Sequence, residues 1–245
     1  MTPAAVLTWI PLVLVLDRHA SLGQQRLLGV GTWLLLAALL SRYDVRTRLQ
    51  VGVVVVFATA VEYTFSGWLG VYTYRLHDVP WFVPPGHGLV YLGALAMGRS
   101  VVFECNRRWL IPATLVVAAT YASWGLFVSG RRDVLGAFWF ACLAVFLLRG
   151  RNPLVFVGAF LVVTYLELLG THLGTWTWQV RDPILGVVAM GNPPSGAAGG
   201  YGFFDAAALY LAPRLVDWLR VPGQRQRVQP VDALHRAELR VPVES

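Results

Sequence analysis

Two glutamates lie inside apolar runs that are long enough to cross a membrane. Glu62 follows VVVVFATAV, and Glu167 follows VFVGAFLVVTYL. A charged side chain in the hydrocarbon region of a bilayer costs free energy and is usually retained because function needs it. The two glutamates therefore predict a membrane protein that carries chemistry inside its helical bundle.

The composition agrees with a polytopic membrane protein. Of the 245 residues, 56% are hydrophobic and only 13% are charged, and the mean hydropathy is +0.58. A soluble domain carries about 25% charged residues, so this chain has too few to cover a water-facing surface. Its basic excess comes from arginine alone, and the arginines lie between the apolar runs and in the C-terminal tail. We therefore expect no nucleic-acid partner.

The apolar runs predict an all-α fold, a polytopic membrane helical bundle. Eight runs can be placed, with seven transmembrane helices as the alternative, at about 3–16, 27–41, 50–72, 81–98, 109–128, 133–148, 153–175 and 197–213. A transmembrane helix needs about 20 residues. The first, second and sixth runs are shorter, so they need tilt or flanking residues to complete a crossing.

The distribution of arginine predicts the orientation. With eight spans, 14 arginines fall on the side that holds both termini and 6 fall on the opposite side. The arginine-rich side of a membrane protein is normally cytoplasmic. We expect a multi-pass protein of the cell membrane with both termini in the cytoplasm, where residues 214–245 form a basic tail.

A second pattern occurs once in each half of the chain. The segment Gly70-Val-Tyr-Thr-Tyr-Arg-Leu-His-Asp78 matches Gly174-Thr-Trp-Thr-Trp-Gln-Val-Arg-Asp182 at a constant offset of 104 residues. An interval of four spans gives the two halves the same orientation in the membrane. The pattern predicts one membrane domain, residues 1–213, built from two parallel four-helix repeats at about 1–105 and 106–213.

Counting residues along the predicted helices places four ionisable groups in one layer. Glu62 and Glu167 lie roughly 12 and 9 Å from the outer boundary, and His87 and Asp205 lie roughly 9 and 12 Å from it. We predict a catalytic site there, because a buried carboxyl favours its protonated form and can donate a proton to a weak base such as an alkene. The alternative is structural, with the carboxyl groups bridging helices by hydrogen bonds.

Aromatic residues near both glutamates predict the lining of an apolar cavity. These are Tyr63, Trp68, Tyr72, Tyr74, Tyr165, Trp176 and Trp178. Their ring faces can hold a lipophilic chain and stabilise a cationic intermediate by cation–π attraction. For the four in the repeated segments, anchoring at the membrane–water interface is the alternative.

Several common catalytic motifs are absent from the sequence. It contains no Gly-x-Ser-x-Gly, no phosphate-binding glycine loop that ends in Lys-Ser/Thr, and no His-Glu-x-x-His. The histidines are scattered, and closely spaced aspartates that could hold Mg²⁺ are missing. We expect neither a metal nor a cofactor, and we expect a lipophilic small molecule and membrane lipids as partners.

One segment resembles a known family. Glu62-x₄-Gly67-x₂-Gly70-x-Tyr72-x-Tyr74, followed by Val79-Pro80 and Pro84, is similar to a pattern in the carotenoid-hydratase-like integral membrane proteins, which act on long polyenes. The chain departs from that family at Pro84-Pro85-Gly86-His87, where an Ile-Pro-Leu type of helix entry would be expected, and in its repeated second half. The architecture also resembles the small integral-membrane terpene cyclases, with Glu62 and Asp205 as the matching acids.

Both resemblances imply protonation of an isoprenoid double bond, and this predicts an enzyme that hydrates or cyclises a carotenoid or terpenoid. Glu62 or Glu167 would be the general acid, and the other glutamate or Asp205 would accept the later proton or orient water. A proton-coupled carrier is the first alternative, because parallel repeats with membrane-embedded acids also suit transport. A non-catalytic scaffold is the second.

Overall fold

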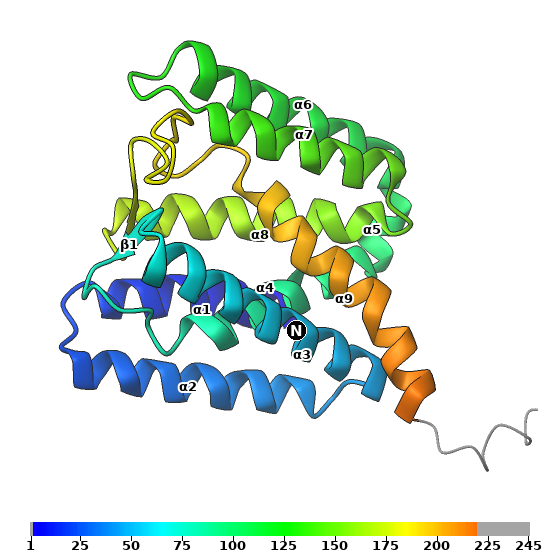
Figure 1. Ribbon diagram of the computed structural model, residues 1–245. Helices are drawn as coiled ribbons and strands as arrows, with labels where there is room; N and C mark the ends of the chain where they lie inside the picture. The colour runs from blue at the N-terminus through cyan, green and yellow to red at the C-terminus, as the bar shows by residue number, and fades with distance from the viewer. Residues whose placement is uncertain (1, 220–245) are drawn as a thin grey trace, which may run out of the picture.

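The computed structural model describes residues 2–219, which form a helical bundle with a small two-stranded sheet at one end (Figure 1). The α-helices of the described residues are α1 (Thr2–Asp17), α2 (Leu22–Leu40), α3 (Val45–Glu62), α4 (Val83–Gly98), α5 (Val101–Cys105), α6 (Arg107–Phe127), α7 (Val134–Arg149), α8 (Pro153–His172) and α9 (Ala197–Leu219). A π-helix, η1 (Tyr63–Trp68), continues α3, and the strands are β1 (Tyr72–Tyr74) and β2 (Trp176–Trp178).

The prediction of a helical bundle is confirmed, and each of the eight apolar runs overlaps a different α-helix. Among the described residues, three helical segments are long and apolar enough to cross a membrane, namely Val45–Trp68, Arg107–Phe127 and Pro153–His172. The short helix α5 and the two strands were not expected. The fold is therefore not purely α-helical.

Two of the predicted spans end earlier than expected, and the reason is the same in both. The helices stop at Trp68 and His172, just before Gly70 and Gly174. These glycines have φ angles of 65° and 73°, a left-handed conformation that glycine adopts without steric cost and that commonly ends a helix. The aromatic residues that follow are thereby released from the helix into strands.

The last helix ends later than expected. It continues to Leu219, past residue 214, where the basic tail was predicted to begin. The remainder of that predicted tail, residues 220–245, lies outside the described residues.

Polar side chains define where several helices begin. Ser21, Asp44, Ser100 and Asp133 each precede a helix and accept a hydrogen bond from a backbone N–H in its first turn. Such caps satisfy donors that have no partner within the helix.

The centre of the bundle consists of α3, α4, α8 and α9. The most extensive helix contacts are those of α4 with α8 and of α3 with α9. Close approach of α4 and α8 depends on glycine. A Cβ atom on Gly98 would lie 2.7 Å from the backbone of Val155, and one on Gly158 would lie 2.6 Å from the carbonyl oxygen of Ala94. Small residues at a crossing let two helix backbones come together.

The two strands join the halves of the chain at one end of the bundle (Figure 1). They pair antiparallel, with Thr73 opposite Thr177, Tyr72 opposite Trp178, and Tyr74 opposite Trp176. The residues in the two repeated segments therefore lie side by side. Because β1 follows η1 and β2 follows α8, the pairing also brings the ends of these two helices together.

Candidate functional site

A cavity of about 450 Å³ lies between the central helices and the two strands. Its walls come mainly from α1, α3, α4, α8 and α9 and from both strands, with smaller contributions from α2, η1, α7 and the segment between β2 and α9. The lining is largely aliphatic and aromatic. Its volume lies within the range of about 300–1,000 Å³ that is usual for small-molecule sites.

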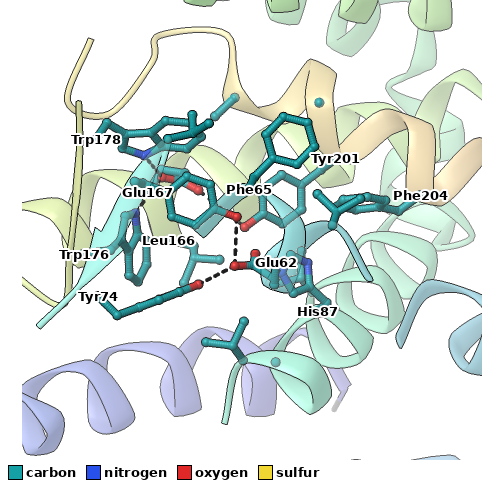
Figure 2. Close-up of a pocket in the computed structure, with 18 of the residues that line it drawn as sticks. Glu62, Phe65, Tyr74, His87, Leu166, Glu167, Trp176, Trp178, Tyr201 and Phe204 are labelled. Atoms are coloured by element: carbon teal, nitrogen blue, oxygen red, sulfur yellow. Dashed lines mark hydrogen bonds and ion pairs between the residues drawn. The ribbon is translucent and has the colours of Figure 1, made fainter. Parts of the chain in front are cut away.

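Glu62 enters the cavity from the end of α3, where only 6% of its surface is exposed. One carboxylate oxygen, Oε2, accepts hydrogen bonds from the hydroxyls of Tyr72 at 2.8 Å and Tyr74 at 2.7 Å (Figure 2). The other, Oε1, lies 2.9 Å from Nε2 of His87 on α4. Burial and the nearby Glu62 carboxyl raise the pKa of the Tyr74 phenol well above its ordinary value, so this hydroxyl remains a donor.

Glu167 enters the same cavity from α8 and is 4% exposed. Its Oε2 accepts hydrogen bonds from the indole N–H groups of Trp176 at 3.0 Å and Trp178 at 3.3 Å (Figure 2). Its Oε1 lies 3.4 Å from the hydroxyl of Tyr201 on α9. An indole can only donate a hydrogen bond, so the Tyr201 side is where Glu167 can carry a proton.

Tyr201 connects the surroundings of the two carboxyl groups. Its hydroxyl contacts Glu167, and its ring stacks on the imidazole of His87 with centroids 5.0 Å apart. Phe204 packs edge-on against both rings, at 5.6 Å from His87 and 5.7 Å from Tyr201. The two acids therefore belong to one connected cluster of polar and aromatic side chains.

The segment between β2 and α9 contributes to the cavity wall on the side of the strands. Asp182, Ile184, Val188 and Met190 from this segment line the cavity. Two side chains from the α6–α7 connection hold the segment in place. Arg131 donates to the carbonyl oxygens of Met190, Trp178 and Gln179, while the buried Asp133 accepts from Gly191 and Ser195.

Seven of the residues predicted for the site come together in this cavity. They are Glu62, His87, Glu167, Tyr72, Tyr74, Trp176 and Trp178. The four aromatic residues of the strands, for which anchoring at the membrane surface was the alternative, point their polar atoms at the two glutamates.

Three aromatic residues predicted to line the cavity do not do so. Tyr63, Trp68 and Tyr165 are exposed and lie outside the cavity wall. Successive residues of a helix point about 100° apart, so Tyr165, two positions before Glu167, points about 200° away from it. Tyr63 and Trp68 lie on the exposed side of η1.

Asp205 also lies outside the cavity wall, although it is buried in α9 with 4% of its surface exposed. Its Oδ2 atom has no hydrogen-bond partner. The predicted grouping of Asp205 with the two glutamates is therefore corrected. Asp205 follows Tyr201 by one helical turn and lies beyond the residues that contact the glutamates.

Sequence analysis missed Tyr201 and Phe204. A signal was available for Tyr201, because it precedes Asp205 by four residues and so shares its helix face. Phe204 had no such signal, since an aromatic residue in an apolar helix is ordinary. Within residues 2–219, no group of three or more His, Cys, Asp or Glu side chains is placed to hold a metal ion.

Comparisons of the chain with family models, with curated proteins and with solved structures find no match.

Proposed function

We propose that this chain is an integral membrane enzyme that protonates a double bond of a lipophilic isoprenoid and gives a hydrated or cyclised product. The observation that carries the proposal is the pair of buried carboxyl groups, Glu62 and Glu167, in one aromatic cavity. Acid catalysis on an alkene needs a proton donor, a proton acceptor and protection of the cation from water. The site offers a candidate for each.

Glu167 is the candidate proton donor. Its hydrogen-bond partners are two indoles and a tyrosine hydroxyl, and none of these is basic. Loss of its proton would leave a negative charge in an apolar cavity with no basic side chain bonded to it, which is costly. Transfer of that proton to one alkene carbon leaves a cation on the other carbon and a carboxylate on Glu167.

Glu62, paired with His87, is the candidate proton acceptor. The imidazole and the two tyrosine hydroxyls can stabilise its carboxylate before the reaction. The pair can then take a C–H proton next to the cation, which forms a new double bond, or a proton from a water molecule that adds to the cation. Either way, one proton leaves Glu167 and one reaches Glu62, so the cycle is complete once Glu62 has lost a proton and Glu167 has regained one.

The aromatic lining supports the cationic intermediate. Tyr72 and Trp178 have ring centroids 4.5 Å apart, and Tyr74 and Trp176 have centroids 6.1 Å apart. Ring faces attract a cation, and more strongly where water is excluded. These four rings also hold the two carboxyl groups in position.

The proposal includes the eight-span, duplicated architecture with both termini in the cytoplasm. Its support is that corresponding parts of the two halves meet. Gly70 and Gly174 share a conformation, and the strands pair about Thr73 and Thr177. In the proposed repeat, α3 corresponds to α8 and α4 to α9, so the contact of α4 with α8 is equivalent to the contact of α9 with α3. This is the arrangement expected for two parallel repeats about an axis along the membrane normal.

The test is expression of the chain in a host that accumulates isoprenoids, followed by lipid extraction and mass spectrometry. We expect a product that is either isobaric with its precursor or heavier by one water. Glu167→Gln and Glu62→Gln should each lower its formation by a factor on the order of 10² or more. The exposed Glu104→Gln is the control and should leave it unchanged. Full activity of both cavity variants would refute acid catalysis.

The paired halves also favour a second candidate, a proton-coupled carrier, because alternating access commonly uses repeats with buried acids between them. Transport and product assays separate the two. A carrier would move its solute in proteoliposomes only with a proton gradient and would leave the solute chemically unchanged. An enzyme would form its product without any gradient. If the glutamates serve only as structural bridges in a scaffold, both Glu→Gln variants should be silent.

A further inference from the structure

A second group of polar side chains lies inside the bundle, away from the cavity wall. Gln50 on α3, Tyr91 on α4 and Asp205 on α9 are at most 4% exposed. Both amide atoms of Gln50, the hydroxyl of Tyr91 and Oδ2 of Asp205 are buried without a hydrogen-bond partner. The Nδ1 atom of His87 is also buried without a hydrogen-bond partner.

These side chains lie between the candidate site and the opposite end of the bundle. Tyr91 follows His87 by four residues on α4, and Asp205 follows Tyr201 by four residues on α9, so each lies one turn deeper on the same helix face. The Asp205 carboxyl is close enough to the Tyr91 hydroxyl to interact with it electrostatically. Both helices pack against α3.

The group continues toward the surface at that opposite end. Gln50 lies three residues after Thr47, which is also buried. The hydroxyl of Thr47 accepts a hydrogen bond of 3.4 Å from the guanidinium of Arg99, and the Arg99 side chain is exposed. Buried polar side chains thus occur on α3, α4 and α9 between His87 and the exposed Arg99, and α4 and α9 both pack against α3.

Unpaired polar atoms in such a group need an explanation. Native proteins leave few buried polar groups without a partner, and internal water molecules commonly supply the missing bonds. A water molecule needs two to four polar partners, which these side chains can provide from three helices. An apolar side chain at any of these positions would have packed more favourably if no water were present.

We propose that Gln50, Tyr91 and Asp205 bind a chain of internal water molecules that runs from Thr47 and Arg99 to Nδ1 of His87 and exchanges protons between the candidate site and the cytoplasmic side. Its use during turnover rests on the proposed function, whereas the water site itself does not. In each proton step, a water O–H bond breaks as a new bond to the next oxygen or nitrogen forms, so no other reactant is needed. The path would deliver a proton to the His87–Glu62 pair, or remove one from it, after a reaction step has changed the protonation of the pair.

The water site can be tested on the purified full-length chain in lipid nanodiscs by radiolytic hydroxyl labelling, which modifies side chains next to bound water. We expect Tyr91 to be labelled in spite of its burial. Asp205→Asn, which keeps the hydrogen-bonding capacity, should retain the labelling. Gln50→Leu combined with Asp205→Leu should abolish it while the protein stays folded.

An absence of labelling at Tyr91 would overturn the proposal. If the three side chains bond directly to one another without water, Tyr91 will be unlabelled in the wild type, and the proposal is overturned. The double leucine variant, which removes the polar groups of Gln50 and Asp205, would then leave Tyr91 unlabelled as in the wild type.

Activity separates this proposal from the proposed function. Tyr91→Phe and Asp205→Asn should slow turnover and increase its solvent deuterium isotope effect, whereas Glu167→Gln abolishes turnover altogether. If the wild type forms no isoprenoid product, the proposed function has failed, and the labelling still decides the water site. If the product forms at an unchanged rate and isotope effect in both variants, the proton path is refuted alone.

Discussion

The two halves of the molecule hold their glutamates in the same way but with different chemistry. Each carboxyl group accepts hydrogen bonds from the first and third residues of the strand that follows it. In the first half these residues are tyrosines, and His87 joins them; in the second half they are tryptophans. A phenol or an imidazole can both give and take a proton, but an indole only donates its N–H.

The difference teaches how two similar backbone arrangements can form an asymmetric site. Each strand holds its carboxyl group from corresponding positions, and the identity of the donors then sets what each group can do. Glu62 accepts from two phenols and lies beside an imidazole, whereas Glu167 accepts from two indoles and has one phenol, that of Tyr201, near its other oxygen. Two acids with separate roles are what acid–base chemistry requires.

The backbone differs between the halves by one residue. Gly70 lies eight positions after Glu62, but Gly174 lies only seven positions after Glu167. The extra residue falls in η1, the π-helix, while α8 remains α-helical over the corresponding turn. A π-helix bonds each residue to the fifth one along rather than the fourth, so it absorbs one additional residue without turning the following strand away.

Deletion of one residue should affect the two halves very differently, and this is the largest effect that we expect. Removal of Ser66 shortens η1 to an ordinary α-helical turn and should leave the protein folded. Removal of Leu168 from α8 rotates everything after it by about 100° and should separate Glu167 from Trp176. Size-exclusion profiles and far-UV circular dichroism of the two purified variants would show this. Equal loss of folded protein in both would refute the account of the π-helix.

A glycine in each half offers a smaller test of the same comparison. A Cβ atom on Gly170 would overlap the indole ring of Trp176, whereas one on Gly67 would lie 3.8 Å from the nearest atom, in the ring of Tyr63. Gly170→Ala should therefore lower the free energy of unfolding by about 1–3 kcal/mol, as overpacking does. Gly67→Ala should change it by about 0.5 kcal/mol or less. Thermal unfolding in detergent measures both effects. Unchanged stability of the Gly170→Ala variant would contradict the tight contact with Trp176.

The sequence was sufficient to predict the helices and much of the site. Long apolar runs predict helices because a segment in a bilayer must satisfy its backbone hydrogen bonds internally, as a helix does. The rise of a helix converts residue counts into depth, and this placed Glu62, Glu167 and His87 in one layer. All three line the cavity.

Direction around a helix was harder to predict than depth. Asp205 was assigned to the same layer, yet it lies outside the cavity wall, because the face that a residue presents depends on which neighbours the helix packs against. Tyr63 and Tyr165 were misplaced for the same reason. The pairing of β1 with β2 joins segments that are 104 residues apart, and no local pattern encodes such a contact.

Asp182 and Asp78, which correspond in the two repeated segments, give the smallest expected effect. Asp182 accepts hydrogen bonds from the backbone N–H groups of Leu185, Gly186, Val187 and Val188, and these bonds lower the pKa of its carboxyl below the ordinary value. Asp78 accepts one such bond, from Val79. The segment after β2 is therefore braced by its aspartate, and the segment after β1 is not.

The sign of the pH dependence follows from the lowered pKa. Because the ionised form is favoured in the folded protein, Asp182 stabilises its segment at pH values above about 3.9, the ordinary Asp value. That stabilisation is lost as the pH falls through the lower folded value. Hydrogen–deuterium exchange, corrected for the intrinsic effect of pH, should show residues 182–190 opening in acid. Asp182→Asn removes the oxygen that accepts from Val187 and Val188, so it should open the segment at neutral pH, and Asp78→Asn should not. Equal exchange in the two variants would mean that Arg131 and Asp133 alone hold the segment over the cavity.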